Sequence, residues 1–374
     1  MQPDKYNISM LKLSQITDVI ERFAPLPLQE SYDNAGLIVG NRNMDISGAL
    51  ICLDSTEDVI DEAISKGFNL VIAHHPIVFS GLKKINGKNY VERVVIKAIK
   101  NNIAIYAAHT NLDNVRLGVN AKIADKIGLK ETKILSPIKN NLKKLVTYCP
   151  LKDADTIRQA LFHCGAGSIG NYNECSFNAI GYGTFKAGQS TNPHVGKIGE
   201  QHKEEEVRIE TVFPAHLFSN VIKALNEAHP YQEVAYDIYS IENSNPQTGA
   251  GMIGKLEKPM NGIDFLKSLK IMMKTDCIRH SKPLDKMIET IAVCGGAGSF
   301  LLKEAINQSA DVFITGDFKY HEFFDAEGRI IIADIGHYES EQFTKEIFYD
   351  LITTNFPTFA ARISEVNTNP INYI

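Results

Sequence analysis

Apolar runs alternate with amphipathic stretches in the first quarter of the chain. Residues 49–54 (ALICLD) and 69–73 (NLVIA) are apolar, and the stretch between them, STEDVIDEAISK, begins with Ser-Thr and is followed by Gly67. Ser or Thr before an amphipathic stretch and Gly after it are typical of the two ends of a helix. The pattern therefore predicts a strand, a helix and a second strand, a unit whose two strands run parallel.

The same alternation returns near the end of the chain. Strand, helix and strand are predicted for residues 290–295 (TIAVCG), 299–309 (SFLLKEAINQS) and 311–315 (DVFIT). In both halves a further predicted strand then ends at a histidine, within residues 103–113 (IAIYAAHTNLD) and 329–341 (RIIIADIGHYESE). Each half is therefore predicted to be an α/β unit with parallel strands.

The early and late units match in residue type when they are laid over each other without a gap. Cys52 then falls on Cys294, and the tripeptide Glu-Ala-Ile at 62–64 falls on the same tripeptide at 304–306. We interpret the match as an internal duplication that produces two similar α/β lobes. The strand–helix–strand pattern that both units share could also produce a few such identities by itself.

Between the two halves, residues 142–245 follow a different pattern. Residues 183–206 lack apolar periodicity and predict an exposed loop or hairpin. Two strand–helix units in so short a segment suggest an inserted ferredoxin-like α+β domain. We therefore expect a discontinuous α/β domain made of residues 1–141 and 246–374. In the insert, strands are predicted at 142–150, 206–213 and 233–241, and helices at 153–165 and 214–229.

Histidines and carboxylates gather where the predicted strands end. His74 and His75 directly follow one strand, and Asp113 lies just beyond the next. His337 and Glu341 are four residues apart, so a helix that begins near Tyr338 places them about one turn from each other. The carboxyl ends of parallel strands are where open α/β sheets build their sites. The candidate ligands of a metal centre are therefore His74, His75, Asp113, His337 and Glu341.

Imidazole and carboxylate ligands together suit Zn, Mn, Fe or Co. Two adjacent histidines at a turn project to different sides, which favours two ions about 3.5–4 Å apart. A purely structural role stays open for each residue taken singly, because a His-x-x-x-Glu pair is often a salt bridge and Asp113 could be a turn residue. Five such residues at the strand ends of a duplicated fold are harder to explain in that way.

Composition narrows the class of protein. The chain has 374 residues, of which 44% are hydrophobic and 22% charged, and these values predict a globular protein of more than one domain. A net charge of −5 disfavours a nucleic-acid partner. The six cysteines are scattered without a Cys-x-x-Cys pair, and the hydropathy pattern predicts neither a signal peptide nor a membrane span. We therefore expect a cytoplasmic protein with reduced thiols.

Several motifs are spread along nearly the whole chain. They are SYDNAGLIVG (31–40), AHHP (73–76), HTNLD (109–113), AHPYQEVAYDIY (228–239), CGGAGS (294–299), DVFITGD (311–317) and GHYESE (336–341). Together and in this order they resemble the NGG-one-interacting factor three family, whose bacterial members are labelled GTP cyclohydrolase I type two homologues or dinuclear-metal-centre hexameric proteins. The insert is similar as well, although the chain has Gln232-Glu233 where Glu-Glu is common.

The resemblance implies two α/β lobes around a centre of two divalent metal ions, a PII/CutA-like insert and assembly into a homohexamer. It identifies the five candidate ligands with the family's metal ligands, and Glu341 would be the bridge between the ions. It also places four further residues in the same cleft, as groups that orient ligands, move protons or contact substrate. These four are His109, Asp33, Asp317 and His321.

Two functions from different classes follow. The first is a metal-dependent hydrolase of a nucleotide-like or heterocyclic small molecule, which the GTP cyclohydrolase label suggests, although no guanine pocket is evident in the sequence. The alternative is a non-catalytic metal-binding regulatory or scaffold hexamer with a sensor-like insert. Glycines 295, 296 and 298 suit phosphate binding or a tight turn equally well, and Asp33 suits the site or an N-cap equally well.

Overall fold

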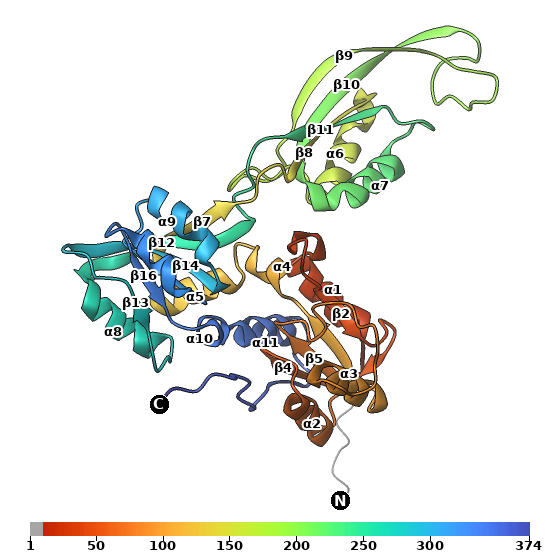
Figure 1. The fold of residues 1–374 in the computed structure, drawn as a ribbon. Helices are drawn as coiled ribbons and strands as arrows, with labels where there is room; N and C mark the ends of the chain where they lie inside the picture. The colour runs from red at the N-terminus through yellow and green to blue at the C-terminus, as the bar shows by residue number, and fades with distance from the viewer. Residues whose placement is uncertain (1–9) are drawn as a thin grey trace, which may run out of the picture. The chain divides into compact units, whose positions relative to one another are not determined.

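The protein is a mixed α/β structure built from two compact units (Figure 1). The structure is a computed structural model, in which residues 10–374 are described. Unit 2 is Pro137–Pro246, and unit 1 combines the chain before Pro137 with Gln247–Ile374. Segments from both ends of the chain therefore build unit 1.

The first sheet of unit 1 has five strands in the order β17-β4-β5-β6-β2. Neighbours from β17 to β6 are parallel, and β2 is antiparallel to β6. Every residue of β4, β5 and β6 is buried, as expected for parallel strands covered on both faces. The strands are β2 (Gly36–Val39), β4 (Ala49–Cys52), β5 (Leu70–Ala73), β6 (Ala104–Ala107) and β17 (Ala361–Ile363).

Helices α2 (Glu57–Lys66) and α3 (Tyr90–Lys100) pack on one face of this sheet. The side chain of Thr56 caps the start of α2, where it accepts a hydrogen bond from the backbone N–H of Val59. Gly67 ends the helix in the left-handed conformation, which glycine adopts without a steric penalty. The helix bounds predicted from the sequence are therefore set by local chemistry.

The second sheet of unit 1 has six strands in the order β13-β16-β15-β14-β12-β7. Its centre, β14-β15-β16, is parallel, while β12 pairs antiparallel with β14 and β13 pairs antiparallel with β16. Helix α9 (Leu302–Asn307) packs on one face. The strands are β7 (Lys130–Pro137), β12 (Gly249–Asn261), β13 (Arg279–His280), β14 (Met287–Ala297), β15 (Val312–Gly316) and β16 (Ile331–Asp334).

One hydrophobic core joins the inner faces of the two sheets. It contains Ile51 and Ile72 from the first sheet and Val293 and Ile314 from the second, all buried. Since both sheets contribute to this core, the carboxyl ends of their parallel strands are held in a fixed relation. The remaining elements of unit 1 are α1 (Leu13–Phe23), α4 (Thr110–Asp113), α5 (Val119–Ile127), α8 (Gly262–Met272), α10 (His337–Glu341), α11 (Thr344–Asn355), β1 (Leu11–Lys12), β3 (Asp45–Ile46), and the short 3-10 helices Leu26–Leu28, Ser299–Leu301 and Tyr320–Ala326.

Unit 2 has one antiparallel sheet in the order β11-β8-β10-β9, with two helices. Residues Val207, Ile209 and Phe213 of β10 are buried against residues of both helices, so the helices cover one face of the sheet. In chain order the elements are β8 (Leu142–Pro150), α6 (Ala154–His163), β9 (Phe177–Lys186), β10 (Gln201–Pro214), α7 (Phe218–Ala228) and β11 (Tyr236–Ile241), with short 3-10 turns at Leu151–Asp153 and Ala215–Leu217.

Two local expectations can be compared with the structure. The stretch 183–206, predicted as an exposed loop or hairpin, is a hairpin: Lys186 at the end of β9 pairs with Gln201 at the start of β10, and residues 187–200 connect the two strands. Backbone pairing supports these strands although most of their side chains are exposed, which is why apolar periodicity did not reveal them. The single helix expected beyond Tyr338 is two helices, α10 and α11, separated by Gln342 and Phe343.

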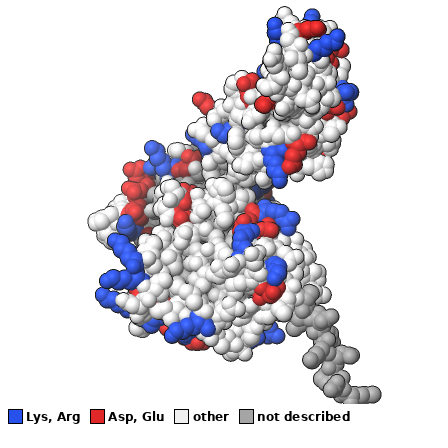
Figure 2. Space-filling model, turned by 90° about the vertical axis from the view of Figure 1, so that its right-hand side faces the viewer, with Lys and Arg blue, Asp and Glu red and all other residues white. Residues whose placement is uncertain are grey.

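The surface charges, the cysteines and the lengths of the helices bear on the expectations from composition. On the face shown in Figure 2, basic and acidic side chains are interspersed among uncharged ones. All six cysteines are free thiols. Within residues 10–374, the helices are too short or too polar to cross a membrane.

Candidate metal centre

The structure brings five strand-end residues together in unit 1. His74 and His75 follow β5, Asp113 ends α4 just beyond β6, and α10, which follows β16, carries His337 and Glu341. Their ligand atoms lie within 4.8 Å of one another in overlapping groups of three. The groups are His74, Asp113 and Glu341; His75, His337 and Glu341; and His74, His75 and His109.

The first group contains two buried polar atoms without a hydrogen-bond partner, Nε2 of His74 and Oδ1 of Asp113. Nδ1 of His74 lies 2.9 Å from the carbonyl oxygen of Ala108, which can only accept, so this nitrogen carries the proton. The lone pair of Nε2 is therefore free, 3.7 Å from Asp113 Oδ1 and 3.7 Å from Glu341 Oε1. Buried polar atoms are almost always partnered in native proteins, so these two are placed to hold a cation.

The second group surrounds the other oxygen of Glu341. Nε2 of His75 lies 3.0 Å and Nε2 of His337 lies 3.2 Å from Glu341 Oε2. The Nδ1 atoms of these two rings are 2.7 Å from carboxylate oxygens of Asp54 and Asp317, respectively. A carboxylate behind the imidazole is the arrangement that orients histidines toward a metal ion.

The spacing of the ligand atoms also fits a first-row transition metal. Metal–nitrogen distances of about 2.0–2.1 Å place two ligands of a tetrahedral ion about 3.3 Å apart. The four separations between a histidine nitrogen and a carboxylate oxygen run from 3.0 Å to 3.7 Å, and all ligand atoms of a group lie within 4.8 Å of one another. Nitrogen and oxygen donors without thiolate suit Zn, Mn, Fe or Co, and the residues present therefore fit such ions.

The charges of the centre influence one another strongly. Burial opposes a positive charge on His75 and His337, yet their hydrogen bonds to carboxylates raise the pKa of His75 to about 10 and that of His337 to about 11. Burial and the negative charge of Glu341 raise the pKa of Asp113 to about 8. Burial disfavours the charge on Glu341 as well, but His74 and its other imidazole neighbours hold its pKa well below the ordinary value. The positive charges of protonated His75 and His337 thus offset the negative charges of the carboxylates. A bound metal cation can supply this positive charge instead.

His109 lies beside the centre rather than between its carboxylates. Its ring centroid is 5.3 Å from those of both His74 and His75. Nδ1 of His109 is 2.8 Å from Oδ1 of Asp33, and the other oxygen of that carboxylate, Oδ2, accepts from the backbone N–H and the hydroxyl of Thr110. Although burial opposes it, these hydrogen bonds lower the pKa of Asp33 to about 2, so the carboxylate stays ionised and orients the ring.

The other two residues expected near the centre differ in their surroundings. Asp317 has φ of 59°, in the left-handed region, and its carboxylate holds His337. His321 is exposed, its ring packs against Tyr320 and Phe324, and it belongs to none of the ligand groups found among residues 10–374.

Asp54 was not singled out from the sequence, although it orients His75. The sequence did contain a pattern that could have identified it: Asp54 lies just after a buried strand, β4, and the histidines follow the neighbouring strand, β5. The role of Gly296 also needed the structure. A Cβ added there would lie 2.5 Å from Glu341 Oε1, and its φ of +62° also favours glycine. The glycine lets the end of β14 approach the centre closely.

Comparisons with known proteins agree over almost the full length of the chain. Residues 11–370 match the family described as Duf34/NIF3 (NGG1p interacting factor 3). The GTP cyclohydrolase 1 type 2 homolog of Bacillus subtilis is 38% identical over 366 residues, which cover 96% of this chain and 98% of the relative. That of Halalkalibacterium halodurans is 39% identical over 365 residues, with coverage of 96% and 98%.

The fold agrees as well. The crystal structure of a Bacillus cereus protein related to NIF3 matches with a TM-score of 0.85 and 37% sequence identity, and the match covers 97% of this chain and 99% of that one. The resemblance expected from the motifs is therefore confirmed over the whole length rather than at isolated sites. This chain belongs to the DUF34/NIF3 family.

Proposed function

We propose that unit 1 binds two divalent transition-metal ions, Zn, Mn, Fe or Co, and that the protein is a metal-dependent hydrolase. His74, Asp113 and Glu341 would hold one ion, and His75, His337 and Glu341 the other, with one oxygen of Glu341 for each. The observation that carries the proposal is the pair of buried, unpartnered atoms, His74 Nε2 and Asp113 Oδ1, aimed at the same point as Glu341 Oε1.

Such a pair of ions, when bound, would acidify a water molecule and neutralise the negative charge that develops during hydrolysis. The protein groups around them have separate tasks. Asp54 and Asp317 hold the rings of His75 and His337 in place. Asp33 holds Nδ1 of His109, so Nε2 of His109 is the atom that would accept and return a proton.

A nucleotide-like or heterocyclic substrate is supported by two aromatic side chains beside His109. The ring of Phe79 lies edge-on to His109 with centroids 6.2 Å apart, and Tyr32 lies 6.3 Å from Phe79. Phe79 is 49% and Tyr32 is 64% exposed, so a planar ring can stack on either. The relatives' name, GTP cyclohydrolase 1 type 2 homolog, agrees with such a substrate, on resemblance alone.

Elemental analysis tests the metal centre. We expect about two ions per chain after supplementation with Zn, Mn, Fe and Co, and loss of both in the double variant His75→Ala/Glu341→Ala. A matched control, His280→Ala/Glu257→Ala, removes an exposed histidine and an exposed acid and should keep the metal. Absence of metal from the unaltered chain after supplementation would refute the proposal.

Turnover separates the hydrolase from the second candidate, a non-catalytic metal-binding regulatory or scaffold protein. Metal-loaded protein is incubated with GTP and with simpler heterocycles, and ring opening and phosphate release are followed. Hydrolysis that His109→Ala slows at least a hundredfold, with metal content unchanged, supports catalysis. Full metal occupancy without any turnover supports the regulatory candidate.

We also propose that unit 1 arose by internal duplication. Its support is the strand register: Ile51 pairs with Ile72 in the first sheet and Val293 with Ile314 in the second. These are the positions that the sequence overlay matches. Residues 142–245 are proposed to be a PII/CutA-like insert, supported by the chain order strand, helix, strand, strand, helix, strand in unit 2.

Two further properties are proposed from the resemblance and the cysteines. A homohexamer follows from the family resemblance, and sedimentation velocity at several concentrations tests it. A cytoplasmic location is consistent with six free thiols, three of which, Cys164, Cys175 and Cys277, are partly accessible. Fractionation of cells that express the chain tests the location.

A further inference from the structure

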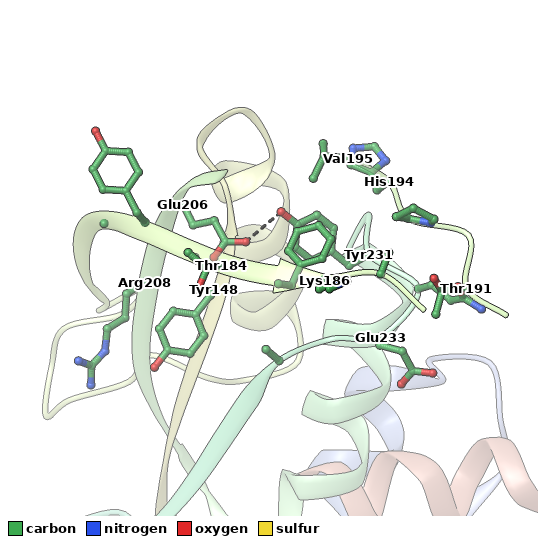
Figure 3. A pocket seen from close by; sticks show the side chains of 18 of the residues that line it. Tyr148, Thr184, Lys186, Thr191, His194, Val195, Glu206, Arg208, Tyr231 and Glu233 are labelled. Carbon is green, nitrogen blue, oxygen red and sulfur yellow. Dashed lines mark hydrogen bonds between the residues drawn. The ribbon is translucent and has the colours of Figure 1, made fainter. Parts of the chain in front are cut away.

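Unit 2 contains an open cavity of about 660 Å³ that is separate from the metal-centre residues (Figure 3). Its volume lies within the range of about 300–1,000 Å³ typical of small-molecule sites. Its lining comes from strands β8, β9 and β10, the loop 187–200 and the segment 231–235 between α7 and β11. Glu206 and Arg208 of β10 reach it from the sheet face opposite the helices, since their neighbours Val207 and Ile209 pack in the helix-covered core.

Two glycines give the cavity a flat floor on β9. Gly181 lies opposite Glu206 in the strand pairing, and a Cβ built on it would meet no atom within 4 Å. A Cβ on Gly183 would come within 2.1 Å of Glu206 Oε2, so the carboxylate lies directly over this residue. Glycine inside a strand often marks a site where another group approaches the backbone closely. At Gly183 that group is the Glu206 carboxylate, and at Gly181 the space above the backbone is open.

Aromatic side chains form a wall beside this floor. The ring of Tyr231 lies 6.5 Å from that of Phe185 and 6.0 Å from that of His194, centroid to centroid. Tyr148 of β8, opposite Arg208 in the strand pairing, adds a further ring to the lining. A planar molecule that enters the cavity can therefore stack on an aromatic face.

Glu206 is the polar anchor of the cavity. The hydroxyl of Tyr231 donates to Glu206 Oε1 at 2.9 Å, the dashed line in Figure 3. Burial and the Glu206 carboxylate raise the pKa of Tyr231, so the hydroxyl remains a donor at neutral pH. A carboxylate has about four lone-pair positions, so Glu206 can still accept from a ligand. Arg208 does not neutralise Glu206, because it pairs with Glu210 at 2.8 Å.

We propose that this cavity binds a planar nitrogen heterocycle with two adjacent N–H donors on one edge, as guanine has. The ring stacks on the aromatic wall over Gly181, and the N–H edge points to Glu206. Two N–H groups match the two oxygens of a carboxylate, whereas an edge that combines a donor with an acceptor leaves one oxygen repelled. The inference concerns unit 2 alone and does not depend on the proposed hydrolase activity.

Calorimetric titration of the full-length protein with guanosine, inosine and adenosine tests the proposal. The His75→Ala/Glu341→Ala background excludes binding at the metal centre. Guanosine has both donors, inosine has one, and adenosine has a donor beside an acceptor. We expect guanosine to bind at least tenfold more tightly than adenosine, with inosine between them, because a hydrogen bond to a charged group contributes that much.

Two variants locate the site, and one is a matched control. Glu206→Gln should weaken guanosine binding at least tenfold, since an amide offers a donor where an acceptor is needed. Glu205→Gln removes the same charge from the exposed neighbour and should leave binding unchanged. Gly181→Val should abolish binding without unfolding the protein, because its side chain meets only open space and its φ is not in the left-handed region.

Three results would overturn the proposal. They are equal affinities for guanosine and adenosine, unchanged guanosine binding in Glu206→Gln or Gly181→Val, and absence of guanosine binding. In the last case, sedimentation of Gly181→Val shows whether the cavity instead receives a second copy of the chain, because the variant would then dissociate.

Discussion

At the scale of single residues, the candidate centre depends on which nitrogen of each imidazole points inward. Nδ1 of His74, His75 and His337 is in each case held by an oxygen outside the centre, namely a carbonyl or a carboxylate. Each ring therefore presents Nε2 to Asp113 or Glu341. The outer oxygens fix the direction of each ring before any ion binds, and the carbonyl of Ala108 also fixes the tautomer of His74.

Gly296→Ala should remove metal binding, because the new methyl group would lie 2.5 Å from Glu341 Oε1 and 3.2 Å from His337 Cε1. Gly67→Ala is the matched control: its φ of +70° is similar, but a Cβ there meets nothing within 4 Å. Both variants should lose about 1–2 kcal/mol of folding free energy from the left-handed backbone. Denaturant unfolding and metal analysis separate the two effects. Metal retained in Gly296→Ala would contradict this account.

Metal affinity should rise steeply with pH. With pKa values of about 10 for His75 and about 11 for His337, both imidazoles are protonated at neutral pH in the metal-free protein, and an ion must displace both protons. Two displaced protons raise the affinity about 100-fold for each pH unit below these pKa values. Asp113 has a pKa of about 8, so below pH 8 metal binding would release at most one further proton, from this carboxyl group.

Zinc titrations in buffers of different ionisation enthalpy count the released protons. The variant Asp54→Asn removes one of the two carboxylates that hold the proton on His75, so it should release fewer protons and bind metal about 10–100-fold more weakly. Asp61→Asn, which removes an exposed carboxylate on α2, should change neither quantity. Release of less than one proton at pH 7 would show that the histidines are not the ligands.

At the scale of elements, the C-terminal segment beyond β17 supports the centre. The backbone N–H of Ser364 donates to Ile51, and the hydroxyl of Thr368 donates to Asp54 Oδ2 at 2.6 Å. The amide of Asn369 donates to Glu339 of α10 at 3.0 Å. The segment thus joins the residue that orients His75 to the helix that carries His337 and Glu341.

Thr368→Val should therefore weaken metal binding by about tenfold, the lower end of what loss of an outer partner costs. Thr368→Ser keeps the hydroxyl and should restore the affinity, which a general loss of packing would not allow. Circular dichroism checks the fold, and competition with a zinc chelator measures the affinity. If the proteins with Val, Ser and Thr at position 368 bind zinc equally tightly, the C-terminal segment does not support the metal centre.

At the scale of the whole molecule, the two compact units have separate hydrophobic cores. Domains with separate cores unfold as separate cooperative units unless their interface couples them strongly. Ligands stabilise only the unit that binds them. The candidate metal centre belongs to unit 1, and the aromatic cavity belongs to unit 2.

Calorimetry should therefore show two unfolding transitions. Zinc at 100 times its dissociation constant should stabilise only the transition of unit 1, by about 2.7 kcal/mol. The His75→Ala/Glu341→Ala variant should lose this shift and keep the transition of unit 2. A single transition that zinc moves as a whole would show that the two units unfold together.

The sequence by itself determined what depends on neighbouring residues and on recurring motifs. Thr56 and Gly67 mark the ends of α2 through local capping, and apolar runs mark β4, β5 and β15 because parallel strands are buried on both faces. His74, His75, Asp113, His337 and Glu341 were selected by their positions at strand ends. Family membership followed from motifs spread along nearly the whole chain.

Only the tertiary structure decided which of these groups meet and which atoms they present. Asp54 orients His75 across neighbouring strands, Thr368 reaches Asp54 from the far end of the chain, and His321 packs with aromatic neighbours and is not part of the ligand groups. β9 and the first half of β10 form through backbone pairing while most of their side chains stay exposed, so they leave no apolar pattern in the sequence. Contacts between residues far apart along the chain depend on packing and register, and local residue preferences do not encode either one.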